Sequence, residues 1–195
     1  MTQGDQFRDS IHQAVDYVSD LLGESVSTAA ATIISCLQLG SRVITCATYG
    51  SITPCEYFVQ ELNKIFIQRT GGISVYSLNS DSRNLGLLRQ GDPGNIFSAQ
   101  FDLVGSPEDL LLLVPGSFPG QQDPSETAIL RLMEKAREKQ CMIICISCSS
   151  RDSFITERLG PGDLTISLGD LTDPDTAVLA LMYVFQIMLK SGRQG

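Results

Sequence analysis

The amino-acid sequence predicts an α/β protein with one parallel sheet of five strands and helices on both faces. Short apolar runs alternate along the chain with longer amphipathic segments, which is typical of parallel strands joined by helical crossovers. The chain has 195 residues, long enough to bury a core and short enough for one domain. Neither an internal repeat nor an interdomain linker interrupts this pattern. We therefore expect a single domain over residues 1–195.

The first half of the chain begins with two expected helices. The first is predicted from apolar residues at helical spacing: Phe7, Ile11, Val15, Val18 and Leu22. A second helix is expected over 25–39, and Gly40 suits the residue that ends it. Beyond it we expect a buried strand at 42–46, a helix at 53–68, a strand at 73–78, and short helical or irregular pieces over 83–101.

The second half continues the alternation. We expect strands at 110–114, 141–147 and 164–168, and helices at 124–139, 153–159 and 174–190. Three helix starts carry proline after a residue suited to capping. These pairs are Thr53-Pro54, Asp123-Pro124 and Asp173-Pro174.

Charge and composition exclude several functions. A net charge of −8 without a basic stripe argues against direct nucleic-acid binding. No run is long enough to span a bilayer, and the polar residues 1–9 do not read as a signal peptide, so we expect a cytoplasmic protein. The Cys145-Ile146-Ser147-Cys148 spacing closes a strand instead of opening a helix, which disfavours a redox pair.

One strand-to-helix loop has the composition of a ligand site. In an open parallel sheet, ligands bind beyond the carboxyl ends of the strands, where helix N-termini attract anions. Residues 46–52 form the first such loop, and they are mostly small or hydroxylated. They suit a phosphate, although their chemistry alone slightly favours a tight capped turn.

Residues 40–62 resemble the signature of phosphoheptose isomerases and their SIS-domain relatives, in which C-G-N-G-G-S precedes a helix carrying H-F-x-x-E. Cys46, Gly50 and Ser51 match the first motif, and Tyr57-Phe58-Val59-Gln60-Glu61 stands at the second. The resemblance implies a Rossmann-like SIS fold, with Gly50 and Ser51 in a sugar-phosphate pocket. It places Glu61 at the position of a glutamate that ligates zinc and acts as an acid–base group. Tyr57 replaces the metal-ligating histidine.

The other family signatures are incomplete. The strand 110–114 leads to a loop in which Ser117 is the one serine left from a Ser/Thr-rich phosphate loop, beside Phe118 and two prolines. The last helix lacks the histidine of the catalytic relatives, and the only histidine in the chain is His12. We therefore expect no catalytic residues, no metal and no cofactor. Ligand contacts are expected from Gly50, Ser51, Ser117 and Glu61, with weak affinity for any sugar phosphate.

Residues 158–164 resemble the branch of the SIS family that associates with the replication initiator DnaA, in which a G-P-x-D segment precedes the last strand. This resemblance predicts a non-catalytic regulatory scaffold, a homodimer or homotetramer whose N-terminal helices (5–39) join an oligomer bundle. The missing metal and histidine positions of the isomerase site argue against enzymatic activity but leave the question open. Two alternatives stand beside the scaffold: a phosphoheptose isomerase and a sensor that binds a phosphosugar without turnover.

Overall fold

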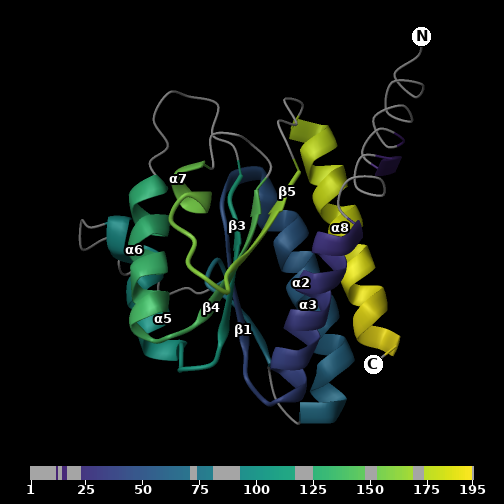
Figure 1. The fold of residues 1–195 in the computed structure, drawn as a ribbon, viewed down its shortest axis with the longest axis horizontal. Coiled ribbons are helices and arrows are strands. Elements are labelled where there is room, and N and C mark those ends of the chain that lie inside the picture. Colours follow the sequence, from purple (N-terminus) through teal and green to yellow (C-terminus); the bar gives the residue numbers. More distant parts are fainter. Residues whose placement is uncertain are drawn as a thin grey trace.

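The computed structural model describes residues 12, 15–16, 23–70, 74–80, 93–116, 125–147, 153–168 and 174–194. At its centre lies a parallel sheet of five strands in the order β2-β1-β3-β4-β5 (Figure 1). The strands are β1 (Val43–Ala47), β2 (Val75–Ser77), β3 (Leu110–Val114), β4 (Met142–Ser147) and β5 (Leu164–Ser167). The predicted fold class is confirmed.

Helices cover both faces of the sheet (Figure 1). On one face lie α2 (Gly23–Gln38), α3 (Ile52–Thr70) and α8 (Pro174–Gln194), and on the other α5 (Ile96–Val104), α6 (Glu126–Glu138) and α7 (Ser153–Thr156). Side chains of β1 alternate between the two resulting cores, with Val43 in one and Ile44 in the other. Because both faces are covered, β3 is buried at all five positions, which explains its continuous run of apolar residues.

Helix boundaries differ from the prediction at several points. Helix α3 begins at Ile52 directly after a 3-10 turn, η1 (Tyr49–Ser51), so Thr53 lies inside the helix instead of capping it. Pro54 is tolerated there because the first N–H groups of a helix have no intrahelical partner. Helix α5 lies partly in the segment expected to hold short helical or irregular pieces and continues past it to Val104, and α8 continues beyond residue 190. Asp123 and Asp173 lie outside the described residues.

The end of α2 follows the predicted pattern. Gly40 has a φ of +86°, and the N–H groups of Gly40 and Ser41 donate to the carbonyl oxygens of Leu37 and Cys36 at 3.2 and 3.1 Å. A left-handed glycine with these bonds is the common way to satisfy the last carbonyl groups of a helix. Among the described residues, no helix has both the length and the apolar character needed to cross a membrane.

Two carboxylates tie the amino ends of neighbouring strands together. Asp109 accepts hydrogen bonds from the Arg42 N–H at 2.9 Å, from the Arg42 guanidinium at 2.8 Å and from the Ser106 N–H at 2.8 Å. Asp163 accepts from the N–H groups of Ile143 and Gly160 at 2.8 and 2.7 Å.

The hydrogen bonds of Asp163 explain the Gly160-Pro161-Gly162-Asp163 segment. Gly162 has a φ of +97°, which favours glycine, and Asp163 closes the turn at the start of β5 through its bond to Gly160. The G-P-x-D pattern therefore has a structural explanation in this fold, without a partner protein.

Asp109 gives the first test of this fold. Replacing it in an Asp109→Ala variant leaves the Arg42 and Ser106 N–H groups without their acceptor, and the Asp109 side chain is only 4% exposed. We expect a loss of about 3 kcal/mol in the free energy of unfolding, or roughly 6–12 °C in Tm. In thermal melts, the control Glu138→Ala should lose less than about 0.5 kcal/mol of the free energy of unfolding, because its ion pair with Lys135 is exposed. Equal losses in both variants would contradict this account.

Candidate functional site

The candidate site lies at the carboxyl ends of β1 and β3, where two loops are held together. The Thr48 N–H donates to the Val114 carbonyl at 3.2 Å, and the Gly116 N–H donates to Thr48 Oγ1 at 2.9 Å. A Cβ atom at residue 116 would lie 2.2 Å from the Thr48 carbonyl oxygen, so only glycine fits. The backbone of this edge is fixed before any ligand binds.

Gly50 and Ser51, two of the residues predicted to contact a phosphate, lie on this edge. Ser51 is buried, its N–H donates to the Thr48 carbonyl at 3.1 Å, and its hydroxyl donates to the Pro115 carbonyl over a long 3.4 Å. Gly50 is exposed, and a Cβ atom there would lie 3.9 Å from Val178 of α8. Ser117 and Phe118 lie outside the described residues. Most donors of this loop are thus already engaged, with the weak Ser51 hydroxyl bond the easiest to exchange.

Two further residues shape the site and were missed by the sequence reasoning. The side-chain amide of Asn79, after β2, brackets Ala47: Oδ1 accepts from the Ala47 N–H at 2.8 Å and Nδ2 donates to its carbonyl at 2.7 Å. The Glu56 carboxylate accepts from the hydroxyl groups of Ser77 and Ser80, the second at 2.5 Å. The three polar residues Ser77, Asn79 and Ser80, at the end of a strand, were the available signal.

Tyr57 and Glu61 lie one turn apart on α3, beside α8. The Tyr57 hydroxyl accepts a hydrogen bond from Gln186 Nε2 on α8 at 3.1 Å, and Glu61 pairs with Lys64. The neighbouring residues Phe58 and Phe185 are fully buried and stack with ring centroids 4.4 Å apart. The structure thus brings Gln186, which sequence reasoning also missed, from α8 into contact with Tyr57.

These residues do not fit the zinc ion that the family resemblance implies. Tyr57 replaces an imidazole with a phenol, which is a poorer zinc ligand, and its oxygen is hydrogen-bonded to an amide. His12, the only histidine in the chain, is exposed. Within the described part of the chain, no group of three histidine, cysteine, aspartate or glutamate residues could hold a metal.

The cysteines near the site are buried thiols. Burial raises the pKa of Cys55 to about 12 and that of Cys46 well above its ordinary value. Thiols held in the neutral form are poor nucleophiles. Cys145 is buried too, and its C-x-x-C partner Cys148 lies outside the described residues.

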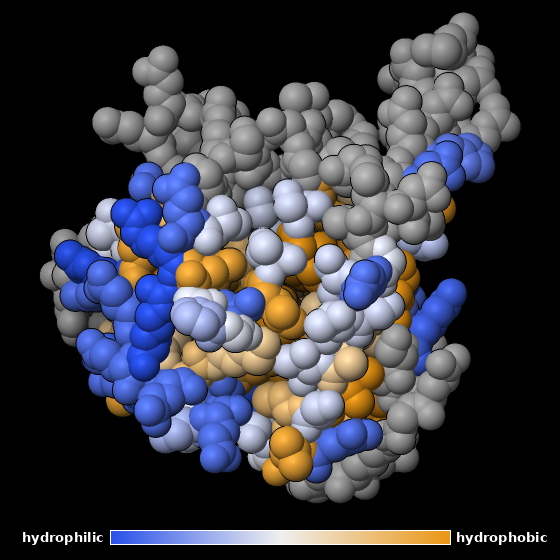
Figure 2. Space-filling model, viewed as in Figure 1, coloured by the Kyte–Doolittle hydropathy of each residue, from blue (hydrophilic) through white to orange (hydrophobic). Residues whose placement is uncertain are grey.

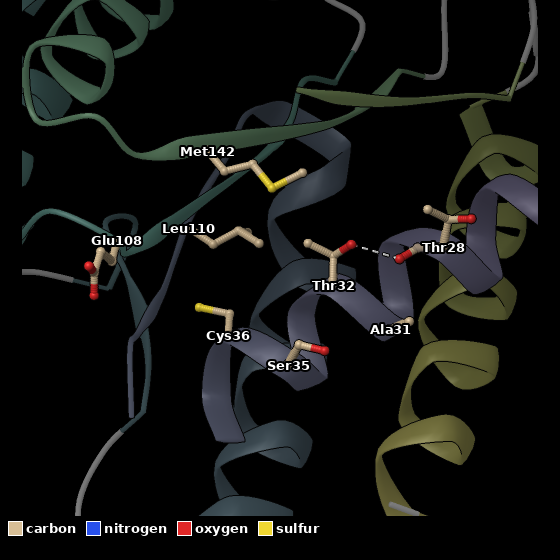
Figure 3. A pocket seen from close by; sticks show the side chains of 8 residues that line it. All are labelled: Thr28, Ala31, Thr32, Ser35, Cys36, Glu108, Leu110 and Met142. Atoms are coloured by element: carbon tan, nitrogen blue, oxygen red, sulfur yellow. Dashed lines mark hydrogen bonds between the residues drawn. The ribbon is translucent and has the colours of Figure 1, made fainter. Parts of the chain in front are cut away.

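A separate cavity of about 510 Å³ lies at the opposite edge of the sheet, where β3 and β4 begin (Figure 3). Helix α2 forms one wall, on which the Thr32 hydroxyl donates to the Thr28 carbonyl at 2.9 Å. Its lining residues are Thr28, Ala31, Thr32, Ser35, Cys36, Glu108, Leu110 and Met142. This set has an acidic residue and no cation, so it does not suit a phosphate.

The fold and the site define a class of protein. A five-stranded parallel sheet, with a loop after β1 that leads into α3 and helices on both faces, is the arrangement expected of a SIS domain.

Comparison with known proteins identifies the relatives. No protein-family profile matches the chain. It is 27% identical to the phosphoheptose isomerase of Shewanella pealeana over 145 residues, which cover 73% of this chain and 70% of that protein. A solved phosphoheptose isomerase from Francisella tularensis superposes with a TM-score of 0.82 at 18% identity, covering all of both chains. That of Neisseria gonorrhoeae gives 0.81 at 16% identity, covering 98% of this chain and 97% of the other. The chain is phosphoheptose isomerase-like and has the SIS-domain fold.

These comparisons correct one prediction. The sequence favoured a non-catalytic scaffold that associates with DnaA. The relatives named above, in sequence and in fold, are phosphoheptose isomerases, which favours the isomerase alternative. The prediction was wrong because it relied on the G-P-x-D segment, which forms a turn in this fold.

Cys55 makes stability depend on pH. Its ordinary pKa is 9.0, and burial raises the pKa to about 12 in the folded protein. Above about pH 9 the unfolded chain therefore loses a proton that the folded chain keeps, so stability falls as pH rises. We expect this thiol to remove about 2 kcal/mol from the free energy of unfolding between about pH 8.5 and about pH 10.5.

Urea unfolding of the wild type and of Cys55→Ala at both pH values measures this contribution. The variant should be less stable throughout but should lose about 2 kcal/mol less over the interval. Equal pH slopes in the two proteins would show that the thiol does not remain neutral in the folded state.

Proposed function

We propose that this chain is a sugar-phosphate isomerase of the phosphoheptose isomerase type. One observation carries the proposal: α3 starts in the loop that holds Gly50 and Ser51, and the same helix carries Glu61 beside α8. The sequence match to phosphoheptose isomerases supports it. Gly50 and Ser51 would contact the phosphate and Glu61 the reacting carbons.

The spacing along α3 suits an extended substrate. With a rise of about 1.5 Å per residue, Tyr57 lies roughly 9 Å and Glu61 roughly 15 Å from Ser51 along the helix axis. Side chains on a helix lean toward its N-terminus, which brings both closer to the loop. An extended seven-carbon sugar phosphate spans a distance of the same order, so its phosphate and carbonyl ends can be recognised by one helix.

The reaction requires one group that moves a proton. An aldose–ketose isomerisation takes a proton from the carbon beside the carbonyl and returns it to the former carbonyl carbon, through an enediol. Glu61 is the base we assign to this step, and a positioned base typically contributes about 10²–10⁴-fold to the rate. One carbon is oxidised as the other is reduced, so no external oxidant or reductant takes part.

Weak phosphate binding is part of this proposal. The Gly116 N–H is taken by Thr48, Pro115 has no N–H, and the Ser51 hydroxyl must leave the Pro115 carbonyl to reach a ligand. The Glu56 carboxylate also lies near the start of α3, where it opposes the attraction of the helix dipole for a second anion.

A phosphosugar sensor is the second candidate. The observation that favours it is the phenol of Tyr57 at the position of a metal-ligating histidine. A sensor would bind the same ligand at the same loop without exchanging its protons.

Assembly into a homodimer or homotetramer belongs to the same proposal, as does a cytoplasmic location. Apolar side chains are exposed on α3 and α8, among them Ile67 at 48% and Met182 at 38%. Hydrophilic residues dominate over α6, whereas hydrophobic residues reach the surface on the side of α2 and α8 (Figure 2). Such patches commonly mark interfaces. A solution mass of one chain, 21.2 kDa, would contradict this assembly.

Proton exchange tests the isomerase proposal. In D₂O, the protein should place deuterium from solvent on C1 of sedoheptulose 7-phosphate, beside the carbonyl, which NMR detects even when net turnover is slow. We expect Glu61→Gln to reduce this exchange by about 10²-fold or more, because the amide cannot accept the proton. The matched control Glu157→Gln, at an exposed position near α7, should exchange like the wild type.

Two results would count against the proposal. Exchange that survives in Glu61→Gln would remove that residue from the role of base. A thermal shift with the ligand but no exchange in the wild type would favour the sensor.

A further inference from the structure

The structure carries a second polar group beside Glu61. We infer that Tyr57 donates a hydrogen bond to the carbonyl oxygen of the substrate, that Gln186 positions it, and that the reaction proceeds without a bound metal. This inference rests on the proposed function.

The hydrogen bond between the two side chains has a defined direction. Gln186 Nε2 donates to the Tyr57 oxygen at 3.1 Å. A tyrosine hydroxyl that accepts one bond keeps its own proton available for another acceptor. Tyr57 is 38% exposed, so a ligand lying along α3 can reach that hydroxyl.

Packing holds the pair in place. Phe58 and Phe185, the sequence neighbours of Tyr57 and Gln186, are fully buried and stack at 4.4 Å with their planes 14° apart. This contact packs α3 against α8 at the residues next in sequence to the hydrogen-bonded pair. A donor held in place by packing loses little energy to reorganisation when charge develops on the substrate.

The chemistry balances with these groups alone. As Glu61 takes the proton from C1 of a ketose phosphate, the electron pair moves onto O2, which the Tyr57 hydroxyl stabilises. The Tyr57 proton passes to O2 and is replaced by the proton of the O1 hydroxyl. Glu61 then returns its proton to C2, which leaves an aldehyde at C1. A fixed donor of this kind typically contributes about 10²–10³-fold to the rate.

The disagreement with the family's zinc site follows from the same geometry. In this chain, a side-chain hydrogen bond joins α3 to α8 where the resemblance would place metal coordination. The donor needed to polarise the carbonyl is then a phenol instead of a metal ion.

Three variants test the roles of the two residues by the exchange of sedoheptulose 7-phosphate protons in D₂O. Tyr57→Phe should lower kcat about 10²-fold and change KM little, because it removes the proposed hydrogen-bond donor. Its Tm should stay close to that of the wild type, because only one hydroxyl group is lost. Gln186→Leu should lower kcat about 10-fold, because the tyrosine remains but is less well placed. In the double variant, Gln186→Leu should add nothing to the loss caused by Tyr57→Phe.

The outcomes separate this inference from the proposed function. No exchange in the wild type would defeat the proposed function itself. Exchange that is retained in Tyr57→Phe, or additive losses in the double variant, would overturn the roles of Tyr57 and Gln186 while leaving an isomerase in place.

Melting temperature and exchange rate, measured with zinc and with EDTA, test whether the reaction needs a metal. Zinc and EDTA should each leave the Tm of the purified protein and the exchange rate unchanged, since a metal that binds the folded state raises its melting temperature. A Tm raised by zinc, or exchange abolished by EDTA and restored by zinc, would show that a metal takes part and would overturn the inference.

Discussion

The close approach of Gly116 to Thr48 is the constraint on which the site depends. It joins the carboxyl ends of β1 and β3 through the bond to Thr48 Oγ1 and leaves no room for a Cβ atom at residue 116. Helix α3 then starts directly after Ser51, whose hydroxyl donates to the Pro115 carbonyl, and farther along the helix Tyr57 bonds to Gln186 of α8. At the other edge, Asp109 and Asp163 fix where the strands begin.

The sequence predicted the sheet well because buried parallel strands leave a strong pattern. All five strands occur where apolar runs indicated them, and the run from Leu110 to Val114 matched to the residue. The glycine after α2 was also found, because a left-handed helix end strongly favours that residue. Helix starts were less predictable: Thr53-Pro54 is compatible with a cap and equally with the first turn of a helix that begins earlier.

The site was only partly accessible from the sequence. Local motifs indicated Gly50, Ser51 and Glu61, and their contacts with a ligand stay a prediction. Asn79 and Gln186 act across 32 and 129 residues of chain, and nothing local marks such contacts. The Gly160–Asp163 segment shows the reverse error, since a turn required by the fold resembled a functional signature. At the α3–α8 seam, a tyrosine–glutamine bond lies where the family resemblance implies metal ligands.

A structure of the protein with bound sedoheptulose 7-phosphate would show where the substrate lies relative to α3. We expect the ligand to lie along α3, with its phosphate beside Gly50 and Ser51. Its carbonyl end should lie within hydrogen-bond reach of the Tyr57 hydroxyl, with Glu61 next to the first two carbons. A sugar phosphate bound at the cavity below β3 and β4, or with its carbonyl end directed away from α3, would contradict it.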